Sequence, residues 1–250
     1  MGQLEGMVAL VTGASSGIGE AIANRFRAEG MTVVGASRSV TSIDGVEWRR
    51  CDVSDSSAVD ALMTGIVIEH GRLDVVVNNA GVQVEKTIAE TTDDDFDRVI
   101  DVNVRGVFNV ARAAVRAMIP AGGGCIVNIG STAATHADHG MAVYNASKGA
   151  VHALTRAIAV DHGPQGIRCV TLAPGWITTA LTDAAFDQAD DPELARADAI
   201  SRHPVGRLGR PEDVAGLCVW LVGEEAGYAS GSVFHLDGGL TAQSPVDPGG

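Results

Sequence analysis

Short apolar segments alternate with longer amphipathic segments along almost the whole chain. The short segments are rich in Val and Ile, which is typical of parallel strands buried on both faces, and they cover residues 8–11, 32–36, 73–77, 125–129, 169–172 and 232–236. The longer segments have helical spacing and predict helices at 17–29, 56–69, 93–119, 142–161 and 212–222. The alternation predicts an α/β fold, a doubly wound parallel sheet with ligands at the carboxyl ends of its strands.

Four segments do not follow this simple alternation. Only eight residues, 38–45, separate the second apolar segment from the one that begins at Val46, so we expect a loop there and not a crossover helix. The Asp triplet at 93–95 suits a first helical turn, where carboxylates complement exposed amides. Residues 178–202 are polar and predict a mobile helical lid over the site. The tail at 240–250 is turn-like or loose.

Size and composition narrow the classes of protein. A chain of 250 residues can form one domain with a substantial core, and 46% hydrophobic with 20% charged residues is typical of a compact soluble protein. The net charge of −13 argues against nucleic acid, and no apolar run is long enough for a membrane span. The first residues carry no secretion signal, and the cysteines form no Cys-x-x-Cys pair, so we expect a cytoplasmic protein with reduced, buried thiols at Cys51, Cys125, Cys169 and Cys218.

A glycine-rich turn follows the first predicted strand and precedes the first helix. Glycines let the backbone approach a pyrophosphate closely, and a helix start offers free N–H groups to its charge. The Gly-x3-Gly-x-Gly spacing differs from the usual dinucleotide fingerprint. Its position favours dinucleotide binding over a purely structural turn, through Gly13, Ser15, Ser16, Gly17, Ile18 and Gly19.

The end of the second strand indicates which dinucleotide binds. A carboxylate at this position would accept a hydrogen bond from a ribose 2′-hydroxyl, whereas an arginine would bind a 2′-phosphate. Here the strand ends in Ser37 and Arg38, and no carboxylate follows before Asp44. A guanidinium suits phosphate geometry, so the sequence predicts NADP(H) over NAD(H), unless Arg38 is only an exposed loop residue.

Tyr144 and Lys148 are four residues apart in a predicted helix and therefore share a face. Lowering a phenol pKa from about 10 by about three units needs roughly 4 kcal/mol, which one cation at about 4 Å supplies at an effective dielectric near 20. The pair suits a tyrosine tuned for proton transfer. Taken alone, the same spacing is more often a packed ring beside a solvated amine.

Several motifs together resemble those of short-chain dehydrogenases/reductases. They are Thr12-Gly13-Ala14-Ser15-Ser16-Gly17-Ile18-Gly19, Asn78-Asn79-Ala80-Gly81, Asn103, Ser131, Tyr144-x-x-x-Lys148, Pro174-Gly175, the stretch 209–215 and Asp237-Gly238-Gly239. Their order and spacing match that family from about Leu4 to Gly239. The resemblance implies one Rossmann-type domain with a seven-stranded sheet and nicotinamide-dependent chemistry on an alcohol or carbonyl.

The resemblance also implies roles for individual residues. Tyr144 would donate the proton in reduction and accept it in oxidation, and Lys148 would lower the tyrosine pKa and hold the nicotinamide ribose. Ser131 would bind the substrate oxygen, and Asn103 would hold a water that links Lys148 to solvent. The remaining cofactor contacts would come from Asp52 and Val53 at the adenine, from Asn79, Ala80 and Gly81 along the adenosine, and from Pro174, Gly175, Ile177 and Thr179 beside the nicotinamide.

Some features of the resemblance bear on the cofactor and on assembly. NADP-preferring members often carry a basic residue where this chain has Ser16, so only Arg38 supports a 2′-phosphate. The resemblance further suggests a homotetramer in which the helices near 93–119 and 142–161 pack across subunits.

Four residues attract a further functional interpretation. His136 and His139 lack a third metal ligand at a recognisable spacing, so we predict no metal site and either a substrate contact from His139 or plain loop surface. Ser131 lacks the Gly-x-Ser-x-Gly elbow of an acyl-transfer nucleophile. Trp176 either caps the nicotinamide or a substrate ring, or packs under the segment that follows it.

The leading prediction is an NADP(H)-dependent oxidoreductase of a secondary alcohol or ketone, acting on a small molecule. An NAD-dependent dehydrogenase of a sugar, polyol or cyclic diol is the main alternative. A nucleotide-sensing protein without turnover is a third possibility, although such a protein has no need of Asn103, Ser131, Tyr144 and Lys148 together.

Overall fold

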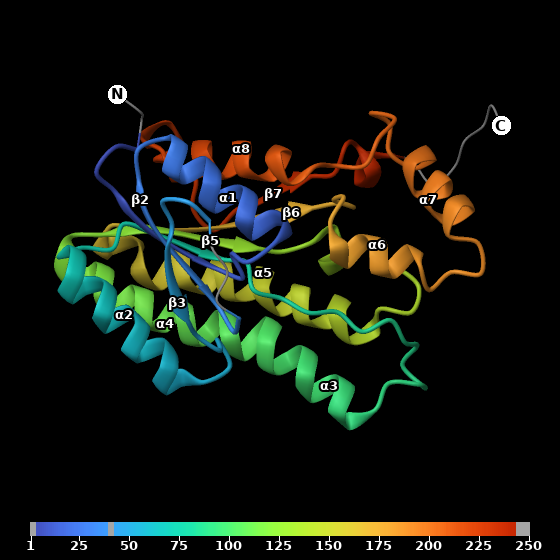
Figure 1. Cartoon of the computed structure of the whole chain (residues 1–250), viewed down its shortest axis with the longest axis horizontal. Coiled ribbons are helices and arrows are strands. Elements are labelled where there is room, and N and C mark those ends of the chain that lie inside the picture. Colours follow the sequence, from blue (N-terminus) through green and yellow to red (C-terminus); the bar gives the residue numbers. More distant parts are fainter. Residues whose placement is uncertain (1–3, 40–42, 244–250) are drawn as a thin grey trace.

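A computed structural model of the chain describes residues 4–39 and 43–243. Seven parallel strands form one sheet in the order β3-β2-β1-β4-β5-β6-β7 (Figure 1). The strands are β1 (Val8–Thr12), β2 (Thr32–Ser37), β3 (Glu47–Arg50), β4 (Val75–Asn78), β5 (Gly124–Ile129), β6 (Ile167–Pro174) and β7 (Val233–Leu236). The predicted doubly wound parallel sheet is therefore confirmed.

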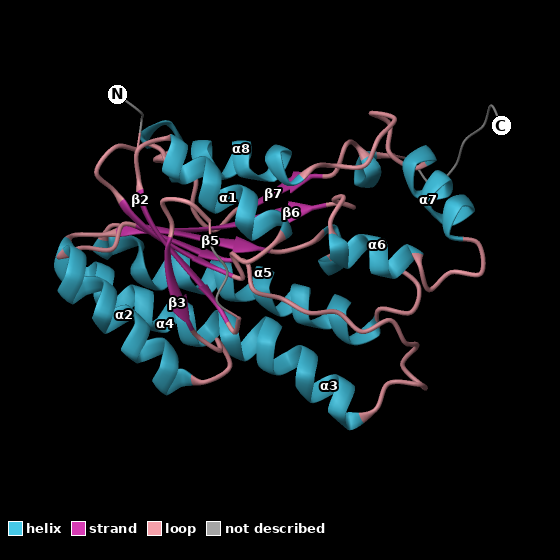
Figure 2. Ribbon diagram, in the orientation of Figure 1, coloured by secondary structure: helices cyan, strands magenta, loops and turns pink. Residues whose placement is uncertain are grey.

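Helices cover both faces of the sheet (Figure 2). α1 (Gly17–Ala28) and α8 (Pro211–Val222) pack on one face, where Phe26 and Leu221 join the core beneath Val11. α2 (Ser56–His70), α4 (Val107–Met118) and α5 (Ala142–His162) pack on the other face, around Leu10 and Ile126. Because both faces are covered, the inner strands are almost wholly apolar, which is why their sequence pattern identified them.

The edge strand β3 has a different composition. Its sequence is Glu-Trp-Arg-Arg, and its residues are half-buried or exposed because only β2 pairs with it. The apolar segment that the sequence predicts to begin at Val46 thus starts one residue before β3. The described residues of the 38–45 connection form no helix, as predicted, while residues 40–42 lie outside the described part of the chain.

The segment predicted as one helix at 93–119 is divided. α3 (Asp93–Ile100) leads into a π-helix, η1 (Asp101–Gly106), and then into α4. The prediction of a continuous α-helix was wrong because helical periodicity does not distinguish an inserted π turn. The Asp triplet does occupy the first turn of α3, where Thr92 and Asp95 form a capping box.

Two helices extend beyond the carboxyl ends of the strands. They are α6 (Ala180–Phe186) and α7 (Pro192–Ser201), and Figure 1 shows them on the side away from the amino end of the sheet. The predicted lid at 178–202 is thus helical, while its motion stays a prediction. Residues 244–250 of the predicted tail lie outside the described range. No helix within residues 4–39 and 43–243 is both long and apolar enough to cross a membrane.

The sheet order places the chemical motifs side by side. From β1 the chain adds β2 and β3 on one side and then β4 on the other side, so the strand order reverses between β1 and β4, and ligands bind at such a switch point in open α/β sheets. The glycine turn follows β1, Asn79 follows β4, and Ser131 follows β5 after one residue. These three strands are consecutive neighbours, so their motifs meet at one edge.

Candidate active site

The glycine turn after β1 has a backbone that only glycine adopts without strain. Gly13 and Gly17 have φ values of +63° and +58°, in the left-handed region. A Cβ on Gly19 would lie 2.3 Å from the Gly13 carbonyl oxygen. Ser16 precedes α1 without a side-chain cap, so the first N–H groups of that helix remain available to an anion at the turn.

Polar contacts from β4 hold this turn in place. The Asn79 side-chain amide donates to the carbonyls of Thr12 and Gly13 at 3.0 and 3.1 Å. The Thr12 hydroxyl accepts from the Ala80 backbone N–H at 3.1 Å. Asn79 therefore braces the glycine turn in addition to facing the cavity beside it.

A cavity of about 610 Å³ runs along the carboxyl ends of the strands. Its size and its glycine turn suit a dinucleotide together with a small substrate. Most of the residues that the sequence singled out line it, namely Gly13, Ser15, Ser16, Gly17, Ile18, Ser37, Arg38, Asp52, Val53, Asn79, Ala80, Gly81, Ser131, Tyr144, Lys148, Pro174, Gly175, Trp176, Ile177 and Thr179. Gly19, Asn103 and His139 are not among the lining residues.

The two ends of the cavity differ in chemistry. At the β2 end, Arg38 is exposed, and Asp52 accepts hydrogen bonds from the backbone N–H and hydroxyl of Ser54 at 3.0 and 2.7 Å. At the β5 end lie Ser131 and Tyr144. Thr179, at the start of α6, lies against the glycine turn between them, since a Cβ on Gly17 would be 3.2 Å from its methyl group.

Helix α5 is fixed to the sheet so that Tyr144 and Lys148 face the cavity together. The buried Lys148 ammonium donates to the Ile129 carbonyl at 2.9 Å and lies 5.6 Å from the centre of the Tyr144 ring. Two turns further along α5, Thr155 accepts from the Asn128 side chain on β5 at 2.8 Å. These contacts set the register of the helix against the strand that ends beside Ser131.

Burial dominates the electrostatics of the pair. It raises the pKa of Tyr144 to about 12; the Ser131 hydroxyl partly offsets this rise, and the charge of Asp138 adds to it. Burial also lowers the pKa of Lys148 to about 8. The sequence predicted that Lys148 lowers the pKa of the Tyr144 phenol. In the chain by itself, the pKa of this phenol is raised instead. The physical reasons are the loss of water around the phenol and the direction of the ammonium, which points at the Ile129 carbonyl.

Asn103 lies behind the cavity wall, in the π-helix η1. Its amide nitrogen donates to the Val82 carbonyl at 2.8 Å and to the Ser147 hydroxyl at 3.0 Å, and its oxygen accepts from the Val82 N–H at 2.8 Å. A Cβ on Gly81 would lie 3.5 Å from Asn103 Oδ1 and 3.8 Å from Lys148 Nζ. Asn103 is thus next to the lysine and joins the segment that follows β4 to η1 and α5, while its predicted role toward a water stays a prediction.

The loop between Ser131 and Tyr144 contributes a different residue from the one expected. His136 and His139 are exposed and do not line the cavity, whereas Asp138 does. Val82, Met141, Leu181 and Ala184 also line it and were missed. Their only sequence signal was proximity to a motif or to the predicted lid, and periodicity does not fix the direction of a loop side chain.

Trp176 fits both of its alternative interpretations. Its ring stacks on Phe186 of α6, with centroids 5.2 Å apart, and the guanidinium of Arg196 covers Phe186 from α7. The tryptophan also lines the cavity. It therefore links β6 to the two helices of the predicted lid.

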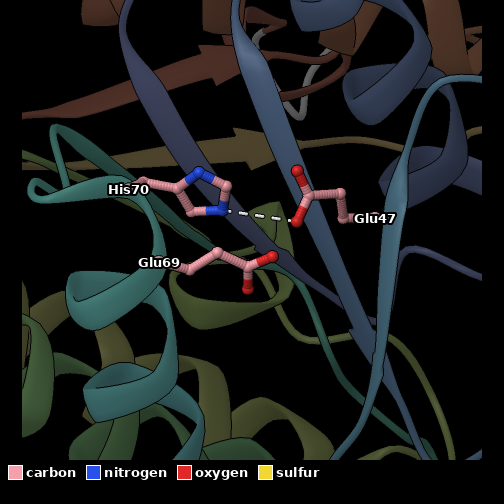
Figure 3. A group of neighbouring side chains, drawn as sticks. All are labelled: Glu47, Glu69 and His70. Carbon is pink, nitrogen blue, oxygen red and sulfur yellow. Dashed lines mark ion pairs between the residues drawn. The ribbon is translucent and has the colours of Figure 1, made fainter.

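Within the described residues, one group of side chains has the spacing of a metal site. Glu47 at the start of β3 faces Glu69 and His70 at the end of α2 (Figure 3). The guanidinium of Arg49 already pairs with both carboxylates, at 3.3 Å from Glu47 and 2.5 Å from Glu69. This positive charge opposes a cation, and the group lies at the amino end of the strands, away from the cavity.

Comparisons with known proteins agree with this geometry. A family model described as enoyl-(acyl carrier protein) reductase matches residues 13–241. The chain is 37% identical over 249 residues to the 3-oxoacyl-(acyl-carrier-protein) reductase of Thermotoga maritima, covering 95% of this chain and 99% of that one. It is 40% identical over 250 residues to the 2-(R)-hydroxypropyl-CoM dehydrogenase of Xanthobacter autotrophicus, covering 94% and 98%. The solved structure of ligand-free aldohexose dehydrogenase from Thermoplasma acidophilum matches with a TM-score of 0.94 at 34% identity, covering 98% and 97%.

Proposed function

Because this chain belongs to the short-chain dehydrogenase/reductase family, we propose that it interconverts a secondary alcohol and a ketone with NADP(H), using Tyr144 as the general acid and base. The observation that carries this proposal is the convergence of Ser131, Tyr144 and Lys148 on one cavity, which continues to the glycine turn and to Arg38. The nicotinamide would supply the hydride that adds to the carbonyl carbon.

The residues of the chain would bind the substrate oxygen and transfer its proton. The Ser131 hydroxyl donates a hydrogen bond to that oxygen and positions it beside the phenol. In the chain alone Tyr144 stays protonated, because burial raises its pKa, so the proton needed for reduction is present on the phenol. In the oxidative direction the phenol must lose its proton first, and the nearby Lys148 ammonium stabilises the phenolate that forms.

Arg38 supports the choice of NADP(H). It is exposed at the end of β2 and lines the cavity, and no carboxylate within residues 4–39 and 43–243 pairs with its guanidinium, which would suit a 2′-phosphate. Dissociation constants for NADPH and NADH test this choice directly. We expect tighter binding of NADPH, and Arg38→Gln should weaken NADPH by about 10- to 100-fold, as for one charged hydrogen bond, with little effect on NADH.

The control for this test is Arg50→Gln. Arg50 is exposed at the end of the neighbouring strand β3 and does not line the cavity, so its loss should leave the ratio of the two constants unchanged. Tighter binding of NADH by the unmodified protein would defeat the choice of NADP(H) and leave the assignment of Tyr144 in place.

A dehydrogenase of a sugar, polyol or cyclic diol that uses NAD is the second candidate. The structural match to an aldohexose dehydrogenase supports it, and so does the short connection between β2 and β3 on the adenine side. Cofactor oxidation with a panel of ketones, aldehydes and cyclic diones, with NADPH and NADH in parallel, separates the two candidates. Tight cofactor binding without turnover on the whole panel would favour a nucleotide-sensing protein.

The assembly and location proposed here rest on surface and thiol chemistry. Phe96 and Phe108 on the α3–α4 segment are 48% and 46% exposed, which supports a homotetramer joined through this segment and α5. The four cysteines are buried free thiols, which supports the reducing environment of the cytoplasm.

A further inference from the structure

Among the described residues, Asp138 supplies the one carboxylate that lines the substrate half of the cavity. It lies in the loop between η3 (Thr132–Ala134) and α5, and it is half-buried. Its charge is close enough to the Tyr144 phenol to raise the pKa of that group. The carboxylate and the reactive phenol therefore face the same space.

Asp138 has no hydrogen-bond partner among the described residues. Burial raises the pKa of its carboxyl, and the charge of Arg202 only partly offsets that rise. Arg202 lies just after α7 and donates instead to Asp198, at 2.8 Å. A half-buried carboxylate without donors costs free energy, and a bound molecule that offers a donor would remove that cost.

The other side chains around this space do not compete for the same role. Val82, Met141, Trp176, Leu181 and Ala184 are apolar. Gln83 and Thr182 are committed, since the Gln83 amide donates to Glu85 at 2.8 Å and the Thr182 hydroxyl donates to the Ile177 carbonyl, and the hydroxyl of Thr132 carries no charge. Ser131 and Tyr144 are needed for the reacting oxygen.

We propose that Asp138 is the specificity residue of the substrate site and accepts a hydrogen bond from a second hydroxyl group of the substrate, close to the reacting carbon. The substrate class is then a neutral hydroxy ketone and the diol formed from it. An anionic substrate is disfavoured because its charge would approach an unpaired carboxylate. This inference rests on the proposed oxidoreductase function.

The test compares matched substrates in the presence of cofactor. The ratio of kcat/KM for 3-hydroxybutan-2-one to that for butan-2-one is expected to be about 10- to 100-fold, as for one hydrogen bond to a charged group, with the anion 3-oxobutanoate slower than both. Asp138→Leu should bring this ratio close to one, and Asp138→Asn, which keeps an acceptor without the charge, should give an intermediate ratio. The melting temperature of both variants should equal or exceed that of the unmodified protein, because Asp138 makes no hydrogen bond among the described residues and its burial is unfavourable.

Asp190→Asn is the matched control. Asp190 is exposed between α6 and α7 and does not line the cavity, so removing its charge should leave the ratio unchanged. An equal ratio in Asp138→Leu and the unmodified protein would overturn the inference, as would a preference for butan-2-one or for the anion.

Calorimetry separates failure of this inference from failure of the proposed function. If no ketone is turned over although NADPH binds, the proposed function fails. Binding of butane-2,3-diol and butan-2-ol to the protein with NADP⁺ still tests Asp138 in that case. Tighter binding of the diol that is lost in Asp138→Leu supports the inference, and equal binding of the two alcohols contradicts it.

Discussion

His152 lies one helical turn beyond Lys148 on α5 and is 4% exposed. Burial lowers the pKa of its imidazole to about 4, and the charges of His235, Lys148 and Arg156 act in the same direction. Its Nε2 atom has no hydrogen-bond partner in the described part of the chain, and a Cβ on Gly130 would lie 2.5 Å from that atom. The imidazole is thus a neutral packing residue directly behind the strand end that carries Ser131.

This burial predicts a specific loss of stability in acid. Between pH 6.5 and pH 4 the unfolded chain binds a proton on His152 and the folded protein does not, so the free energy of unfolding falls as the pH falls. From pH 7 to pH 5 this one group removes about 1–2 kcal/mol. Urea unfolding of His152→Gln at both pH values should show a loss that is smaller by this amount. An identical loss in both proteins would contradict the neutral imidazole.

At the scale of residues, the sequence predicted which residues form the site better than it predicted the surroundings of each side chain. Tyr144 and Lys148 were found because helical spacing is a local property. The raised pKa of Tyr144 was not predicted, because it depends on burial in the folded protein and on the charge of Asp138. Asp138 itself was missed for the same reason, since a loop side chain takes its direction from contacts distant in the sequence.

At the scale of elements, the glycines of the first turn and of α2 differ in a testable way. Gly19 has no room for a methyl group, because a Cβ would lie 2.3 Å from the Gly13 carbonyl and 2.4 Å from the Asn79 amide. Gly65 lies in the middle of α2, is exposed, and has no atom within 4 Å of a Cβ position.

These differences predict that replacement of glycine by alanine has opposite effects on the free energy of unfolding at the two positions. Gly65→Ala should raise the free energy of unfolding by about 0.5–1 kcal/mol, because alanine favours the helix. Gly19→Ala should lower it by about 1–3 kcal/mol and weaken NADPH binding, because the turn must shift. Thermal unfolding with and without NADPH measures both effects. A neutral Gly19→Ala would mean that the turn accommodates the methyl group.

The apolar periodicity predicted the inner strands and the main helices, because an element buried on one stripe or two faces must be apolar there. Of β3, only an apolar start at Val46 was predicted, since an edge strand with Arg49 and Arg50 does not need to be apolar throughout. The π-helix η1 was also missed. It has a structural consequence, because Asn103 within it joins Val82 to Ser147 behind the cavity.

At the scale of the whole molecule, the predicted homotetramer gives the exposed aromatic residues of the α3–α4 segment a partner. Phe108 is 46% exposed and carries the guanidinium of Arg112 at 5.1 Å from its ring centre. Phe108→Asp should therefore shift sedimentation from a tetramer to a smaller species, since it places a charge in the interface.

Ile68→Asp is the control for this prediction. Ile68 is 80% exposed on α2, outside the helices proposed to meet, so its replacement should not change the sedimentation coefficient. A monomer in the unmodified protein would refute the tetramer, whatever the variants show.

Assembly and the motion of the α6–α7 segment are the properties that a single sequence predicts least. Both depend on which exposed apolar side chains pack against another surface, and this packing is decided by the three-dimensional shape of the surface. The stacking of Trp176 on Phe186 illustrates the point, since the tryptophan was recognised but its partner was not.

The central claim is that Tyr144 transfers the proton to the substrate oxygen, and Tyr144→Phe tests it most directly. Phenylalanine keeps the ring above Lys148 and removes only the hydroxyl. On the best ketone of the panel, the single-turnover rate of NADPH oxidation should fall by about 100- to 10,000-fold, with the dissociation constant of NADPH changed by less than about threefold. A rate within about threefold of that of the unmodified protein, at saturating NADPH, would contradict the account.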